Sequence, residues 1–197
     1  MTDMPQLSIP IPSSLLVQTL EQRDPDVFRH GQRVGQVAGL IGARLGLTQE
    51  ELRILRTAGE LHDIGKLAIP SFLVHKEGVF TETEYLIFKH HSGLGGAILE
   101  EHHQPLELAH AALHHHERWD GRGYPHGLRG EEIPLFARIV TVADAYDAMI
   151  SGRTYRSLLG HAEALEEIGR CCGGQFCPEV VEAFLAAPFR AEVMRAG

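Results

Sequence analysis

The sequence predicts an all-α fold, organised as a single-domain helical bundle. Apolar residues recur at helical spacing in several segments, and two Thr residues, each followed three positions later by Glu, mark helix starts. Strand patterns are scarce, and the only candidate is a small hairpin around residues 127–134, within a segment that otherwise resembles a glycine-rich loop. At 197 residues, the chain is long enough for one well-buried core and too short for two ordinary domains with a linker.

The first long helix is expected to begin after Asp24, which suits an N-cap, with Pro25 at the first helical position. Its apolar face is formed by Val34, Val37, Ala38, Ile41 and Leu45. Gly46 is expected to end it. Before this helix, residues 1–23 are expected to form an N-terminal arm with a short helix.

Two capping boxes, Thr48 with Glu51 and Thr81 with Glu84, each predict a further helix start. The first helix should run into the segment LHDIGKLAIP, where Gly65 and Pro70 break it, and the second should continue to about Leu99.

Prolines mark later helix starts. Pro105 should open a helix that ends near HHHER, residues 118–134 should form a glycine-rich loop, and Pro134 should open the next helix. Two more helices are expected at about 160–171 and 178–187. The predicted domain therefore spans residues 24–187, and residues 188–197 form a C-terminal tail.

Composition narrows the class of protein. A hydrophobic fraction of 44% and a charged fraction of 22% are typical of soluble globular proteins. A net charge of -8 argues against binding a nucleic acid polymer, which relies on clustered Lys and Arg. The sequence lacks an apolar stretch of the roughly 20 residues that a membrane span needs, and its start does not resemble a signal peptide, so we expect a cytoplasmic protein.

Histidine is unusually frequent, with 13 residues. Several lie with aspartates near the ends or on one face of predicted helices: His30, His62, Asp63, His91, His115, His116 and Asp144. Any one of these histidines alone is more often solvated than a ligand, but together they exceed what a tetrahedral zinc site takes. Two divalent metals about 3.5–4 Å apart suit this inventory better. Two bound cations would also raise the net charge to roughly -4.

The motifs LHDIGKLAIP at 61–70, HHERWDGRGYP at 115–125 and VADAYDAM at 142–149 resemble, in order, those of the HD-GYP family. The resemblance extends from about Asp24 to Phe184. It implies a helical domain that binds two or three metals, commonly iron or manganese. It also implies a phosphodiesterase that hydrolyses cyclic di-GMP to pGpG or GMP.

By the same resemblance, His30, His62, Asp63 and Asp144 would form the general HD metal site, and Asp63 would bridge to a second metal. His91, His115 and His116 would hold that second metal. His91 is preferred to His90 because the family pattern has a glycine four residues after the histidine, here Gly95. The remaining histidines, including His114, His102, His103 and His110, are expected at the surface or in supporting positions.

Other site residues also follow from the resemblance. Asp26, four residues before His30, occupies the position of a glutamate that helps to hold a third metal in trinuclear members, although an acid there also suits the helix dipole. Lys66 would contact substrate phosphate, and Arg153 and Arg156 resemble a basic pair that binds phosphate. Whether a third metal binds is left open.

The expected chemistry follows from metal coordination, which lowers the pKa of water to about 7 and makes a metal-bridged hydroxide available as the nucleophile. Asp63 and Lys66 are the expected catalytic residues. Gly123, Tyr124 and Pro125 supply no acid or base, so this loop is expected to serve structure, substrate access or docking. In the family it has been linked to diguanylate cyclase domains.

Two alternatives stay open. The chain is also consistent with an HD phosphohydrolase for another nucleotide or for a mixed cyclic dinucleotide. The second alternative is a catalytically weak effector that binds cyclic di-GMP.

Overall fold

The computed structural model describes residues 11–151 and 159–188, and these residues form an all-helical fold, as predicted. The elements, in chain order, are α1 Ser13–Arg23, α2 Pro25–Arg44, α3 Gln49–Leu61, η1 Ile64–Ala68, α4 Ser71–Val74, α5 Glu82–Glu101, α6 Leu106–His114, η2 Gly130–Glu132, α7 Leu135–Ser151, α8 His161–Arg170 and α9 Pro178–Leu185. The hairpin expected around residues 127–134 is wrong: that segment contains the short 3₁₀ helix η2, and the described residues form no strand.

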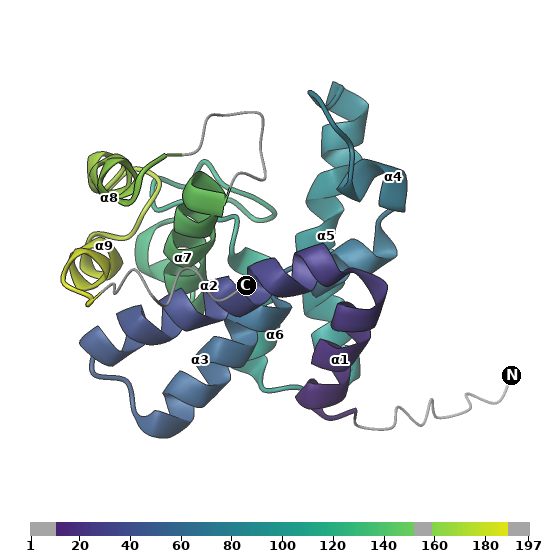
Figure 1. The fold of residues 1–197 in the computed structure, drawn as a ribbon, viewed down its shortest axis with the longest axis horizontal. Helices are drawn as coiled ribbons and strands as arrows, with labels where there is room; N and C mark the ends of the chain where they lie inside the picture. Colours follow the sequence, from purple (N-terminus) through teal and green to yellow (C-terminus); the bar gives the residue numbers. More distant parts are fainter. Residues whose placement is uncertain (1–10, 152–158, 189–197) are drawn as a thin grey trace, which may run out of the picture.

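Helix α2 runs through the middle of the molecule, with α8 and α9 at one end and α4 and α5 at the other (Figure 1). It packs against α3 and α7, and α6 packs against α3, α5 and α7. Four residues of the apolar face predicted for α2 are buried, Val34, Val37, Ala38 and Ile41, whereas Leu45 lies just after the helix and is partly buried. Helix α1 contributes Leu16 and Leu20 to the same core. No helix among the described residues is both long enough and apolar enough to span a membrane.

The helix starts follow the predicted local chemistry. The Asp24 carboxylate accepts a hydrogen bond from the backbone N–H of Val27, 3.1 Å away, and Pro25 opens α2. Thr48 and Thr81 both form complete capping boxes, with Glu51 and Glu84 respectively. These short-range bonds satisfy amides that have no partner within the helix.

Two glycine contacts set the distances between the helices that carry the candidate ligands. A Cβ on Gly59 would lie 2.5 Å from the Cα of Gly35, so α3 approaches α2 more closely than a side chain would permit. A Cβ on Gly65 would lie 1.9 Å from the carbonyl oxygen of His91. The turn that follows α3 therefore rests directly on the backbone of α5.

The glycine-rich loop after α6 is held from inside by the buried Glu117 carboxylate. This carboxylate accepts hydrogen bonds from the backbone N–H groups of His126 at 2.7 Å, Gly127 at 3.1 Å and Leu128 at 3.1 Å. Gly123 lies so close to the chain that a Cβ would be 2.5 Å from the Arg118 nitrogen. Hydrogen bonds and close backbone packing therefore hold this loop against the rest of the fold.

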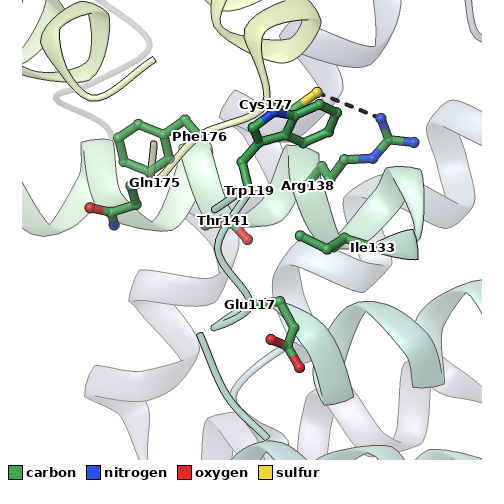
Figure 2. A pocket seen from close by; sticks show the side chains of 8 residues that line it. All are labelled: Glu117, Trp119, Ile133, Arg138, Thr141, Gln175, Phe176 and Cys177. Carbon is green, nitrogen blue, oxygen red and sulfur yellow. Dashed lines mark hydrogen bonds between the residues drawn. The ribbon is translucent and has the colours of Figure 1, made fainter. Parts of the chain in front are cut away.

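The same loop is anchored to the C-terminal part of the chain around Trp119. The Trp119 backbone N–H donates to the Gln175 carbonyl at 3.1 Å, and the Arg138 guanidinium lies 5.8 Å from the centre of the Trp119 ring. Figure 2 shows Trp119, Arg138 and Cys177 gathered around a cavity of about 10 Å³, room for about one water molecule. Glu117 lines the cavity too, so the loop is held from two sides.

Candidate metal centre

The predicted donors of the two halves of the site meet where α2, α3, α5, α6 and α7 converge. The imidazoles of His62 and His91 are fully buried, and His30, Asp63 and His115 are nearly so. His116 and Asp144 are partly exposed. Three groups of donors lie within 4.8 Å of one another: His91, His115 and His116; His30, His62 and Asp144; and His62, Asp63 and His115.

Four of the five histidines have their Nδ1 atoms held by an acceptor outside the cluster. The Nδ1 of His62, His91 and His115 each face the carbonyl oxygen three residues earlier, at 2.7–2.8 Å. His62 and His115 follow directly after α3 and α6, where last-turn carbonyls lack helical partners. A proton on Nδ1 leaves the lone pair on Nε2, the atom that faces the cluster.

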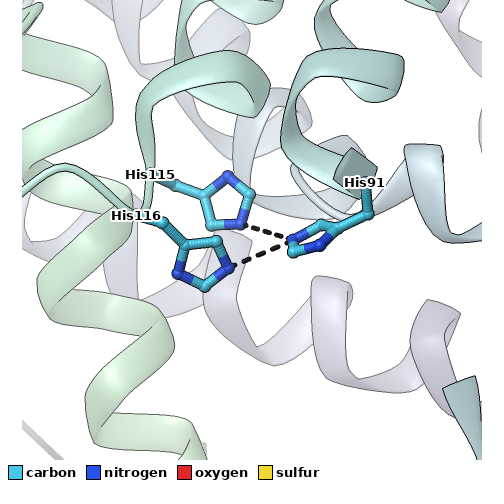
Figure 3. Close-up of side chains that lie close together, drawn as sticks. All are labelled: His91, His115 and His116. Atoms are coloured by element: carbon cyan, nitrogen blue, oxygen red, sulfur yellow. Dashed lines mark hydrogen bonds between the residues drawn. The ribbon is translucent and has the colours of Figure 1, made fainter. Parts of the chain in front are cut away.

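The Nε2 atoms of His91, His115 and His116 point toward one another (Figure 3). The Nε2 of His91 lies 3.4 Å from that of His115 and 3.1 Å from that of His116. Burial lowers the pKa of His91, places that of His115 well below its ordinary value, and lowers that of His116 to about 3. Neutral imidazoles with converging lone pairs form a nitrogen site suited to a divalent cation.

The other half of the cluster combines imidazole and carboxylate. The Nε2 of His30 lies 2.9 Å from an Asp144 oxygen, and the Nε2 of His62 lies 3.9 Å from the same oxygen. The Nε2 of His62 is buried and has no hydrogen-bond partner among the described residues. A bound ion would give this nitrogen the partner that a buried polar atom requires.

Asp63 lies between the two halves. Its Oδ2 is 3.8 Å from the Nε2 of His30 and 3.4 Å from that of His62, and its Oδ1 is 3.5 Å from the Nε2 of His91 and 3.9 Å from that of His115. One oxygen therefore faces each half.

The charge on Asp63 is maintained by its neighbours. Burial alone would raise its pKa, but the Lys66 ammonium, which pairs with Oδ2, and His62 hold the pKa of Asp63 well below its ordinary value. Burial acts on Asp144 in the same way, and the neighbouring His30 and His62 hold its pKa below its ordinary value. Both carboxylates are anionic at neutral pH.

A third aspartate, Asp147, was missed by the sequence analysis. It is fully buried, and its Oδ2 lies 2.7 Å from the Nδ1 of His30. The Arg33 guanidinium donates to both oxygens, at 2.6 and 2.9 Å. A carboxylate behind a ligand histidine fixes its orientation and raises its basicity. The sequence held one indication that Asp147 lies near the site: it follows Asp144 by three residues, a spacing that places both on the same face of α7.

A cavity of about 330 Å³ opens beside the cluster, lined by His115, His116 and Asp144. Tyr85 on α5 and Arg122 and Tyr124 on the glycine-rich loop complete much of its wall. These three residues were not predicted as site residues. The ring of Tyr124 stacks on that of His116, with centroids 4.7 Å apart and planes inclined by 25°.

Lys89 and Arg118 add positive charge around this cavity. The Lys89 ammonium lies 5.0 Å from the centre of the Tyr85 ring and 5.4 Å from that of Tyr124. Arg118 lines the cavity itself but pairs with Asp120 through two bonds, at 3.1 and 2.8 Å. The space beside the donors therefore combines aromatic and cationic groups.

Other predicted residues lie apart from the cluster. The Asp26 side chain is 66% exposed and pairs with Arg29, and Asp26 belongs to none of the close donor groups found in the described residues. A third metal there stays a prediction. Arg153 and Arg156 fall outside the described residues.

The histidines that matched no motif take different positions. His90 and His103 are exposed, whereas His102 and His110 are half-buried. His114 is buried and forms a separate group with Glu117 and His126.

A match to the HD domain family covers residues 14–179. The chain is 45% identical, over 84% of its length, to a cyclic di-GMP phosphodiesterase of Thermotoga maritima, and 42% identical, over 87%, to the cyclic di-GMP phosphodiesterase response regulator RpfG of Xanthomonas campestris. It spans 45% and 46% of these two relatives, less than half of each.

Among solved structures, the HDG"Y"P protein Bd1817 of Bdellovibrio bacteriovorus superposes with a TM-score of 0.68. The superposition covers 88% of this chain and 56% of that one, at 22% identity, so it shows a shared fold. HD-domain phosphohydrolases are metal-dependent, and the His and Asp groups of this chain provide donors for metal ions. The chain belongs to the HD domain family and, by its motifs and relatives, to the HD-GYP group within it.

Proposed function

We propose that this chain is a phosphodiesterase that hydrolyses cyclic di-GMP to pGpG or GMP with two bound divalent metals, iron or manganese. The observation that carries the proposal is the position of Asp63, whose two oxygens face two separate groups of imidazole donors. A carboxylate placed in this way suits a bridge between two cations. The names of the two relatives support the substrate.

His30, His62 and Asp144 would hold one ion, and His91, His115 and His116 the other, with Asp63 shared. Ions held there would supply a nucleophile at neutral pH by lowering the pKa of bound water, and would polarise the phosphate. His or Asp ligands do not select one metal, so iron and manganese are proposed from the family resemblance.

The chain's own residues would bind and orient the dinucleotide. Lys66 lies beside Asp63 with its side chain 14% exposed, which supports a role in which its ammonium would neutralise a phosphate oxygen at the centre. Arg122 would attract the second phosphate from the wall of the cavity. Tyr85 and Tyr124 offer ring faces and edges for a guanine base. Arg153 and Arg156 remain proposed phosphate contacts.

The direct test is turnover by protein purified without oxygen and loaded with iron(II) or manganese(II). Cyclic di-GMP, a mixed cyclic GMP-AMP dinucleotide and linear nucleotides are incubated side by side, and the products are separated by chromatography. We expect pGpG or GMP from cyclic di-GMP only when metal is present. Preference for another substrate would identify the chain as a phosphohydrolase for that substrate. Tight binding of cyclic di-GMP without turnover would identify it as an effector.

The glycine-rich loop is also proposed as a docking site for a signalling protein such as a diguanylate cyclase. The support is its place at the edge of the cavity, where Arg122 is exposed. Pull-down with purified cyclase, compared between wild type and Arg122→Glu, tests this contact.

A further inference from the structure

A second set of metal-type donors lies between the end of α6 and the glycine-rich loop. It consists of His114, the last residue of α6, with Glu117 in the following turn and His126 in the loop. One donor atom from each lies within 4.8 Å of the other two. This set shares no residue with the three groups of the metal centre. Binding of an ion here can therefore be measured separately from binding at the central cluster, and it does not rest on the proposed phosphodiesterase activity.

His114 carries an unsatisfied atom. Its side chain is more than nine-tenths buried, and its Nδ1 has no hydrogen-bond partner among the residues that the structure describes. The nearest acceptor is Oε1 of Glu117, 3.9 Å away, which is beyond hydrogen-bond reach. Two ligands of one tetrahedral zinc ion, each about 2.0–2.2 Å from it, lie about 3.4 Å apart. A shift of a few tenths of an ångström would bring these two atoms to that separation.

Holding the loop explains only part of this arrangement. The three backbone amides that bind Glu117 account for its burial, because a buried carboxylate needs such donors. They leave the His114 nitrogen without a partner, and they leave unexplained why the ring of His126 lies 5.3 Å from that of His114. A cation bound by all three side chains would explain both.

We propose that His114, Glu117 and His126 bind a divalent transition metal ion, with Zn²⁺ as the best fit. Two imidazoles and one carboxylate are ligands that zinc accepts, and a water molecule or His110 completes four-coordination. His110 precedes His114 by four residues on α6, with ring centroids 5.9 Å apart. Such spacing places both rings on one helix face.

The consequence of this site is a metal link between α6 and the loop. His126 directly follows Tyr124 and Pro125, and Tyr124 lines the cavity beside the metal centre. An ion that joins His126 to His114 would add a restraint to this segment, which is already held by the hydrogen bonds to Glu117 and by the contacts of Tyr124 with His116. We therefore expect zinc to protect the backbone amides of His126, Gly127 and Leu128 from hydrogen exchange.

The test compares the zinc content of the wild-type protein, one variant and one control. Each is loaded with manganese and then dialysed to equilibrium against buffered, micromolar free Zn²⁺. The variant is His126→Ala, because His126 is exposed and its loss leaves the core intact. The matched control is His103→Asn, which removes another exposed histidine and keeps a residue that tolerates its positive φ of 52°. We expect one zinc ion fewer per chain in His126→Ala than in wild type and the control.

Two measurements on the wild type need no variant. Crystals soaked in zinc and measured on both sides of the zinc absorption edge should show an anomalous peak between His114 and His126. Hydrogen exchange should slow at the three loop amides when zinc is added. Equal zinc content in His126→Ala and wild type, an equal loss in the control, or anomalous peaks confined to the central cluster would overturn the proposal.

Discussion

Replacing Asp147 with asparagine tests whether the buried carboxylate behind His30 supports metal binding. In the native protein, one Asp147 oxygen accepts from His30 and Arg33, and the other accepts from Arg33 alone. Asparagine keeps the shape but offers one oxygen and one N–H₂ group. Whichever way the amide turns, its N–H₂ group meets a donor.

Each orientation has a different cost. An N–H₂ group facing His30 would move the imidazole proton to Nε2 and remove the lone pair that points at Asp63 and Asp144. An N–H₂ group facing Arg33 would leave a guanidinium, whose side chain is 21% exposed, without its full ion pair. Changes to groups that orient a ligand histidine lower metal affinity about 10–100-fold, or about 1.4–2.8 kcal/mol.

The assay is competition for metal between the protein and a chelator of known affinity, followed by metal analysis. Arg33→Lys is the matched control, because it disturbs the ion pair and leaves the bond between Asp147 and His30 in place. We expect Asp147→Asn to lose metal at lower chelator concentration than wild type or Arg33→Lys. Wild-type affinity in Asp147→Asn, or an equal loss in Arg33→Lys, would refute the orienting role.

Four further predictions concern the centre. Asp63→Ala should abolish turnover and release metal, because both cations would lose a shared ligand; retained activity with full metal content would contradict the dinuclear proposal. Lys66→Ala should lower kcat/KM about a hundredfold while the protein keeps its metal, as measured by kinetics and metal analysis; unchanged kcat/KM would remove its role. Gly65→Ala should unfold at lower denaturant concentration, since its Cβ would lie 1.9 Å from the carbonyl oxygen of His91; an unchanged midpoint would show that η1 can shift. The metal-free protein should lose stability as the pH falls from 6.5 toward 3, because the unfolded chain protonates His116 and the fold, where its pKa is about 3, does not. The slope should be about 1.4 kcal/mol per pH unit for each such histidine, and a flat denaturation midpoint over that range would argue against it.

The parts of the fold that could be predicted are those that depend on nearby residues. The caps at Asp24, Thr48 and Thr81 each join atoms three residues apart, so the pattern is visible in the sequence. The choice of His91 over His90 rested on Gly95, and its physical cause is now visible. A Cβ on Gly95 would lie 3.3 Å from the Gly65 nitrogen, which follows the His-Asp pair by two residues.

The features that were missed depend on residues far apart in the chain. Asp147 lies more than 110 positions from both of its partners in α2, so its role follows only from the packing of α7 on α2. The expected hairpin did not form, because the loop amides of residues 126–128 bond to the Glu117 carboxylate and pair with no neighbouring strand. Tyr85 and Tyr124 come from different elements, and their shared cavity is a property of the folded chain.

The helix ends at the centre also determine an order of assembly. Helices α3 and α6 end directly before His62 and His115, so the partial negative charge of each C-terminus adds to the carboxylates of Asp63 and Asp144. A doubly charged anion that enters the cavity before the cations would be repelled by this field, which Lys66 offsets in part because it pairs with Asp63. Cations are drawn to the same field. Metal should therefore load first, and a cyclic dinucleotide should bind the metal-free protein weakly.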